Sequence, residues 1–381
     1  MASYRRLTRR DFLNRVPLAA GALTIPGILA ACGRTPAPAA SPSAVSTANI
    51  EGTKIKASTY GGFFEENYRK MYPAFTDETG VEVESVSEPT SEVWVTQLQQ
   101  SVQAGTAPPS DVSMLSGVGI QRAINGEIFA PIDLTAVPNS KFLAEGFVRE
   151  SGEGLVAGIG AVSWFITIVS NTERVKESPD TWTAFWEPEW RNELALLRNA
   201  GNSFLIEITA ASYFDGYDVL QTQEGVEEVL AKLAEVKPNV KLWYRDEANA
   251  QNAFNTGEVS LGQFYHDITT FAASQGEALR SVFPTEGAIL DSGFWHISRN
   301  SENVPACHAF IDYFCRPEIQ AELARTLGTS PVAKKEEMDL TEEEYTTVSG
   351  PGPEAALRPE YKIYDQWEDW IDQKWSEMII S

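Results

Sequence analysis

The chain has 381 residues, with 53 Asp and Glu against 30 Lys and Arg, which gives a formal net charge of −23 at pH 7. The first 31 residues hold five arginines and one aspartate, so 25 basic and 52 acidic residues follow them. This balance argues against nucleic acid as a partner, because that binding needs lysines and arginines to neutralise phosphates. It is compatible with a cationic ligand, and equally with an ordinary solvated acidic surface.

Residues 1–31 are typical of a signal peptide. Five arginines lie within the first 15 positions, and Val16–Ala31 is an apolar run interrupted by Pro26. The run is shorter than the roughly 20 residues that a membrane-spanning helix needs, and its basic flank suits an export signal. The sequence TRRDFL at positions 8–13 resembles a twin-arginine signal, with general export as the alternative. A permanent membrane anchor and a buried core helix are the other interpretations of the run.

Cys32 follows this signal in the sequence LAAC, which resembles a bacterial lipobox. Cleavage before such a cysteine leaves its thiol free to carry diacylglycerol. Residues 32–52 are rich in Pro, Ala and Ser and have few side chains able to pack, so we expect a disordered tether. We therefore predict lipidation of Cys32 and a location in the periplasm or on the outer face of the cell membrane, with membrane contact through the lipid.

From position 54 the chain alternates strand and helix patterns. Strands are predicted at 54–59, 81–87 and 111–115, and helices at 65–79 and 93–104. The first helix has apolar side chains on one face, and a glycine follows its last residue. Alternation at this spacing is typical of a parallel sheet built from βαβ units.

The second half of the chain continues this alternation. The sequence SPDTWTAFWEPEW at 178–190 predicts a turn and then an aromatic-rich helix. The tail carries tryptophans at helical spacings, which favours a helix that packs on the body of the protein. Further strands are predicted at 162–171, 193–197, 258–267 and 289–298, and further helices at 225–236, 249–255, 305–315 and 317–327.

The cysteines and histidines after the signal give no sign of a disulfide or a metal site. Cys307 and Cys315 are about 12 Å apart along a helix, whereas a disulfide needs Cα atoms within about 7 Å, so we expect buried free thiols. His266, His296 and His308 show no metal-ligand spacing. The chain also lacks C-x-x-C, H-E-x-x-H, G-x-S-x-G and Walker-loop motifs. We therefore expect no catalytic residue, no metal and no cofactor.

Side chains that can bind a ligand follow or end several predicted strands. In open α/β sheets, ligands bind just beyond the carboxyl ends of the strands. Aromatic faces, hydroxyls and carboxylates together can hold an ammonium group, through cation–π contacts and charge-assisted hydrogen bonds. The competing interpretation of each residue is an ordinary core or rim position. The predicted ligand-binding residues are Tyr60, Ser116, Tyr265, Asp267 and Asp291.

Six segments in a fixed order carry a resemblance to a known family. The chain resembles the bacterial extracytoplasmic solute-binding proteins of ABC importers, and most closely their spermidine/putrescine-binding branch. The segments cover most of the chain after the tether. They are TYGGFFEENYRKMYPAFTDETGVEVE, PPSDVSMLSGVGIQRAINGEIFAPID, SPDTWTAFWEPEWRNELALL, NTGEVSLGQFYHD, FPTEGAI and ACHAFIDYFCRPEIQAELARTLGTSP.

The resemblance implies an α/β type II periplasmic-binding-protein fold, in which two lobes joined by hinge crossovers close over a solute. The crossovers would lie near 165–170 and 292–297. Lobe 1 would then hold residues 53–165 plus 297–335, and lobe 2 residues 166–296 plus 336–381. The partners implied are a small-molecule solute and the membrane subunits of an ABC permease. We expect a monomer without enzymatic activity.

Family ligand positions carry over to this chain one at a time. The loop around Tyr60 corresponds to the family's first-strand loop, and Ser116 falls on a family serine. Tyr265 stands where the polyamine binders place a tryptophan, with Asp267 just beyond it.

The sequence EGAILDSGFWHI departs from the polyamine pattern. The polyamine binders have an aromatic residue there and, two positions later, an aspartate that grips an amine; this chain has Asp291 and Gly293. Val118 also replaces an aromatic residue near Ser116. The leading hypothesis is a receptor for a polyamine or related organic cation. The alternatives are another solute, such as an amino-acid-like zwitterion, a sugar or an anion, and an exported enzyme that uses paired carboxylates.

Overall fold

The computed structural model describes residues 50–380 apart from positions 90 and 246, all within the unit Ala44–Ser381. The predicted signal peptide, Cys32 and nearly all of the predicted tether lie outside the described residues.

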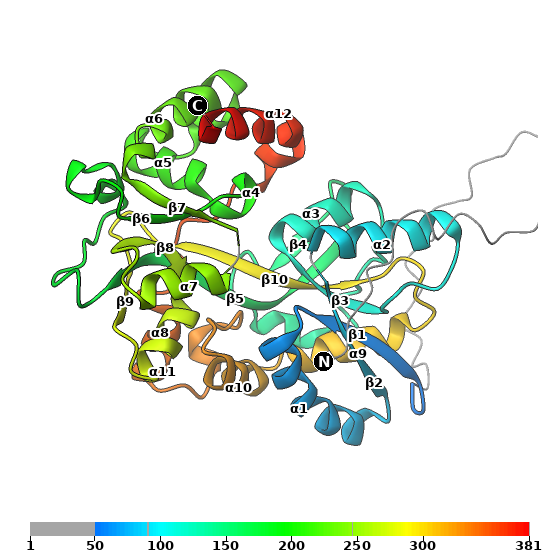
Figure 1. Cartoon of the computed structure of the whole chain (residues 1–381). Coiled ribbons are helices and arrows are strands. Elements are labelled where there is room, and N and C mark those ends of the chain that lie inside the picture. The colour runs from blue at the N-terminus through cyan, green and yellow to red at the C-terminus, as the bar shows by residue number, and fades with distance from the viewer. Residues whose placement is uncertain (1–49, 90, 246, 381) are drawn as a thin grey trace, which may run out of the picture. The chain divides into compact units, whose positions relative to one another are not determined.

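Ten strands of the described chain join one mixed sheet (Figure 1). Their order is β2-β1-β3-β10-β5-β8-β6-β7, and β4 and β9 both pair with β5. The strands are β1 (Lys54–Thr59), β2 (Glu82–Ser87), β3 (Val112–Ser116), β4 (Val148–Glu150), β5 (Val156–Asn171), β6 (Leu194–Leu197), β7 (Val240–Tyr244), β8 (Leu261–Tyr265), β9 (Leu279–Val282) and β10 (Ile289–Ile297).

Parallel pairs occupy the two ends of this sheet, as the strand–helix alternation predicted. β1 is parallel to β2 and β3, and β6 is parallel to β7 and β8. The long strands β5 and β10 run antiparallel between these two groups. β5 begins at Val156, earlier than predicted. Its glycines allow neighbouring side chains to pack closely, since a Cβ on Gly160 would lie 2.8 Å from the Cβ of Phe147.

Twelve α-helices and seven short 3₁₀ helices connect the strands of the described chain. The α-helices are α1 (Gly62–Thr79), α2 (Ser91–Ala104), α3 (Gly117–Asn125), α4 (Ala200–Ser203), α5 (Leu205–Tyr213), α6 (Gln223–Ala234), α7 (Glu247–Asn255), α8 (His266–Ser274), α9 (Val304–Phe314), α10 (Pro317–Leu327), α11 (Glu342–Ser349) and α12 (Tyr361–Ile380). The 3₁₀ helices are η1 (Pro138–Phe142), η2 (Trp182–Trp186), η3 (Pro188–Trp190), η4 (Asp218–Gln221), η5 (Lys237–Asn239), η6 (Lys335–Glu337) and η7 (Pro353–Ala355).

Two sequence predictions of secondary structure are wrong. The aromatic helix predicted within 178–190 is two 3₁₀ turns, η2 and η3, because Pro188 cannot continue a helix that has begun before it. The strand predicted at 258–267 ends at Tyr265, since His266 and Asp267 form the first turn of α8. The second correction matters for the site, because it places Asp267 on a helix.

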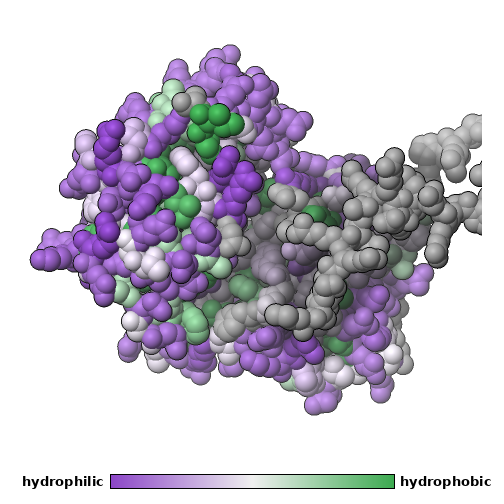
Figure 2. All heavy atoms as spheres, viewed as in Figure 1, coloured by the Kyte–Doolittle hydropathy of each residue, from purple (hydrophilic) through white to green (hydrophobic). Residues whose placement is uncertain are grey.

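Two large hydrophobic cores lie along the sheet. One combines β1, α1, α9 and α10, and the other combines β6, α5, α6 and α12. The long strands contribute to both: Phe165 belongs to the first core and Ile166 to the second, while Ile289 belongs to the second and Leu290 to the first. Hydrophilic side chains cover most of the described surface in view, as the acidic composition leads one to expect (Figure 2).

Cys307 and Cys315 are free and buried, as their spacing predicted. Within the described chain, no three or more His, Cys, Asp or Glu side chains come together in a way that could hold a metal ion. None of the helices in the same residues combines the length and the apolar character that crossing a membrane requires.

Candidate solute-binding site

The predicted ligand-binding residues lie at strand ends and on the long strand β10. Tyr60 directly follows β1, and Ser116 is the last residue of β3, its parallel neighbour. Ser116 Oγ also accepts a hydrogen bond from the Gly119 amide at 3.2 Å, which caps α3. Tyr265 ends β8, and Asp291 lies inside β10. The carboxyl ends of β1, β3 and β8 and the first half of β10 therefore lead into the same part of the structure.

Trp164 on β5 connects the two groups of strands, and sequence reasoning missed it. It pairs directly with Asp291 of β10, and Ile166, two residues further on, pairs with Tyr265 of β8. Residues two apart on a strand share a face of the sheet, so Trp164, Asp291 and Tyr265 lie on one face. Trp164 also packs against both large cores. It is thus the central aromatic residue of the candidate site.

Tyr60 completes the aromatic surface. Its position also accounts for Gly293 in the motif that differs from the polyamine pattern. Its ring meets Trp164 edge to face at a centroid distance of 5.9 Å. Its hydroxyl lies against Gly293, where an added Cβ would be only 2.8 Å from the oxygen. Any larger residue at 293 would have to move Tyr60, so the chain has a tyrosine hydroxyl where the polyamine pattern has an aspartate.

Asp291 is buried and held by two hydrogen bonds. Its Oδ1 accepts from the Tyr361 hydroxyl at 2.6 Å and from the Ser292 amide at 2.7 Å. Burial raises the pKa of Asp291 to about 6, although both hydrogen bonds and the charge of Arg149 lower it. The carboxylate is therefore ionised at neutral pH and oriented by α12.

Asp267 is the least satisfied carboxylate of the predicted set. Its carboxyl group accepts hydrogen bonds from backbone amides of the first turn of α8. Its Oδ1 is buried without a hydrogen-bond partner among the described residues. Burial raises the pKa of Asp267 to about 7, and the charge of Glu247 raises it further. A nearby cation would favour the ionised form of Asp267 and so lower this pKa.

Two further buried polar atoms in the site lack partners within the described chain. They are the Tyr60 hydroxyl and the indole nitrogen of Trp164. Leaving such a group unpaired costs about 1–3 kcal/mol, so each is a group that a solute could satisfy. Burial keeps the pKa of Tyr60 and of Tyr265 well above the ordinary value, so both phenols are neutral hydrogen-bonding groups.

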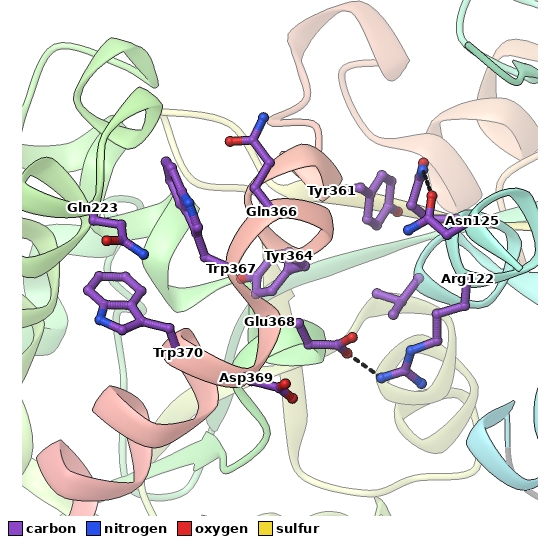
Figure 3. Close-up of a pocket in the computed structure, with 12 residues that line it drawn as sticks. Arg122, Asn125, Gln223, Tyr361, Tyr364, Gln366, Trp367, Glu368, Asp369 and Trp370 are labelled. Atoms are coloured by element: carbon purple, nitrogen blue, oxygen red, sulfur yellow. Dashed lines mark hydrogen bonds and ion pairs between the residues drawn. The ribbon is translucent and has the colours of Figure 1, made fainter. Parts of the chain in front are cut away.

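A pocket of about 390 Å³ lies beside this surface, between α3 and α12 (Figure 3). Tyr361 lines it and links it to Asp291. Figure 3 shows Arg122 of α3 and Glu368 of α12 pointing toward each other, joined by an ion pair. Val118 also lines the pocket, and a smaller hollow of about 60 Å³ that shares Val118 and Arg122 reaches Ser116.

Family comparison identifies the class to which this fold and surface belong. The profile described as "Bacterial extracellular solute-binding protein" matches residues 70–346. The chain belongs to this family, whose members are extracellular receptors for solutes and not enzymes.

Individual relatives are more distant. The chain is 26% identical to the gamma-aminobutyric acid-binding protein of Pseudomonas aeruginosa over 182 residues, which is 46% of this chain and 50% of that protein. It is 26% identical to spermidine/putrescine-binding periplasmic protein 1 of Haemophilus influenzae over 281 residues, which is 71% of this chain and 74% of that protein. The match to the first relative thus spans about half of its length.

Solved structures confirm the mixed α/β fold of periplasmic binding proteins. The spermidine/putrescine ABC transporter substrate-binding protein PotD of Streptococcus pneumoniae superposes with a TM-score of 0.69 at 20% identity. The superposition covers 86% of this chain and 99% of that protein.

Proposed function

We propose that the chain is the receptor of an ABC importer for a small amine-bearing organic cation of the polyamine class. The observation that carries this proposal is the partly buried surface on which Trp164, Tyr60 and Tyr265 adjoin two carboxylates, Asp267 and Asp291. An ammonium group on the aromatic faces gains roughly 0.5–2 kcal/mol from cation–π contact. Its N–H donors suit the open oxygen of Asp267 and the Tyr60 hydroxyl.

Capture by closure of two lobes is part of this proposal. On β5, Phe165 packs in the first core and Ile166 in the second, which supports the predicted first crossover. On β10 the change falls between Ile289 and Leu290, so we place the second crossover there, before the predicted 292–297. Small-angle scattering with and without solute tests the motion, and identical profiles would contradict it.

Delivery to the permease and anchoring at Cys32 complete the proposal. The lipid would hold a monomeric receptor at the membrane on a flexible leash, as the signal and tether sequences predict. The test is palmitate labelling of the full chain and of its Cys32→Ala variant in a bacterial host. Labelling that persists without Cys32 would contradict the anchor.

Calorimetric titration with putrescine and spermidine tests the solute class. We expect saturable binding that Asp267→Asn weakens, because the variant keeps the shape of the side chain and removes its charge. A folded chain that gives no heat at millimolar amine would reject the cation proposal and leave the receptor class intact.

A zwitterion such as γ-aminobutyrate is the second candidate. Gly293 removes one carboxylate from the polyamine pattern, and a relative is a γ-aminobutyrate-binding protein. γ-Aminobutyrate has a carboxylate where putrescine has its second amine. Competition between the two therefore decides whether the site accepts a negative end.

A further inference from the structure

A cavity of about 530 Å³ lies on the other side of β10 from the candidate solute site. Leu290, Ser292 and Phe294 line it, whereas the solute site uses Asp291 and Gly293. Because successive side chains of a strand point to opposite faces, β10 lies between the two sites, and Tyr361 touches both. The remaining lining comes chiefly from residues 144–149 and 353–361.

Two arginines line this cavity, Arg149 on β4 and Arg358 in the segment before α12. Neither guanidinium group has a hydrogen bond or an ion pair with any described residue, and the Arg149 Nε atom is buried. The described chain does pair five other arginines with glutamates, namely Arg122, Arg174, Arg299, Arg316 and Arg325. Other described arginines, such as Arg69 and Arg191, also have no ion pair, but Arg149 and Arg358 differ from them in lining one cavity together.

The packing of these arginines keeps their hydrogen-bond donors available. The Arg149 guanidinium lies over the rings of Phe294 and Tyr361, with its Cζ 5.1 and 4.8 Å from their centroids. Arg358 lies over Phe147 in the same way, at 5.3 Å. Stacking occupies the flat faces of a guanidinium and leaves its N–H groups, which project in the plane, free to bind.

The two charges also act on each other. Burial lowers the pKa of Arg358 and the nearby charge of Arg149 lowers it further, whereas Tyr361 and Glu145 act in the opposite direction. Two like charges brought together in a partly buried site are stabilised by an anion between them.

We propose that Arg149 and Arg358 form a binding site for a small oxyanion, phosphate or a carboxylate, on the face of β10 opposite the solute site. A guanidinium donates two parallel hydrogen bonds to paired oxygens, which both anions offer. Glu145 and Glu354 line the same cavity, but both are exposed and neither forms an ion pair with either arginine, so the guanidinium donors stay open to an anion. The site does not depend on the identity of the solute.

Thermal unfolding and calorimetric titration with inorganic phosphate test this site, with sodium chloride keeping the ionic strength constant. A parallel titration uses acetate. The purified chain should show saturable stabilisation, and Arg358→Gln should weaken the affinity at least tenfold. Binding of both anions identifies a general oxyanion site, and binding of phosphate alone identifies a phosphate site. No saturable response to either anion overturns the proposal.

Three variants control the experiment. Arg299→Gln removes an exposed arginine paired with Glu127 and should keep the full response. Asp267→Asn changes the solute site and should also keep it, and loss of the response there would assign the anion to the solute site and overturn the proposal. Arg358→Lys keeps the stem and charge over Phe147 if glutamine unfolds the chain. It should bind more weakly, because an ammonium lacks the fork, and affinity equal to that of the unmodified chain overturns the proposal.

Discussion

The two faces of β10 differ in chemistry although they belong to nine consecutive buried residues. One face joins Asp291 and Gly293 to the aromatic rings of Trp164 and Tyr60, next to carboxylates. The other face adjoins two unpaired arginines. Strand alternation thus places a surface suited to cations and a surface suited to anions on opposite sides of β10, with Tyr361 in contact with both. The comparison predicts that perturbing one face leaves the other working.

The largest effect should come from Trp164→Ala. Trp164 supplies the central ring of the cation surface and packs against both cores, so its loss should weaken solute binding thirty- to a hundredfold, about 2–3 kcal/mol. Titration with putrescine and spermidine measures this loss. Trp164→Phe keeps a ring and should lose less. The phosphate response should be unchanged, and its loss in a folded Trp164→Ala chain would break the comparison between the faces.

Gly117→Ala should affect both faces, through Tyr361. A Cβ on Gly117 would lie 2.0 Å from the Tyr361 hydroxyl oxygen, so the tyrosine must move away from Asp291 and from Arg149. Gly117 is not among the residues with positive φ, so alanine adds no backbone strain. Overpacking of this kind costs about 1–3 kcal/mol of unfolding free energy, measured by urea denaturation.

A double-mutant cycle separates this clash from a general loss of stability. In a chain that already carries Tyr361→Ala, Gly117→Ala should cost little, because the clashing ring is gone. An equal cost in both backgrounds would mean that Tyr361 does not fill the space above Gly117.

The sequence predicted what depends on local pattern. The strand at 54–59 and the helix at 317–327 have the bounds expected of them, and Gly80 ends α1 in the left-handed conformation. The helix predicted within 178–190 does not form, because Pro188 interrupts the segment whose aromatic spacing predicted it.

The site itself was only partly predictable, because strand register brings its members together. Tyr60, Ser116, Tyr265 and Asp291 are predicted from their places at strand ends or in the motif, and their role stays a prediction. Trp164 becomes a site residue only through its pairing with Asp291, which no local pattern encodes. The bond from Tyr361 to Asp291 spans 70 residues of sequence. Arg149 and Arg358 likewise meet only in the folded chain.

Acid should weaken amine binding on the solute face. The pKa of Asp267 is raised to about 7 and that of Asp291 to about 6, so a proton competes with an ammonium solute below neutral pH. Amine affinity should be at least tenfold lower at pH 5.5 than at pH 8. Asp267→Asn should flatten most of this dependence. Equal affinity at the two pH values would show that neither carboxylate contacts the amine.

The same carboxyls should make the empty chain more stable in mild acid. A carboxyl whose pKa is higher in the folded than in the unfolded chain contributes stability that is complete below the unfolded value and is lost as pH rises through the folded one. Glu88, raised to about 8, and Glu207, raised to about 7, add to this effect by burial. Unfolding free energy should therefore fall from pH 5 to pH 8, and a rise would contradict the assignment.

The smallest effect should come from breaking the ion pair between Arg122 and Glu368. Unlike Arg149 and Arg358, Arg122 has a charged partner. Their side chains are 30% and 39% exposed, so water and salt screen the attraction. A double-mutant cycle with Arg122→Ala and Glu368→Ala should give a coupling below about 1 kcal/mol. A coupling of 2 kcal/mol or more would mean that α3 and α12 are locked together beside the site. The α12 contact would then control both faces of β10, and their independence would no longer hold.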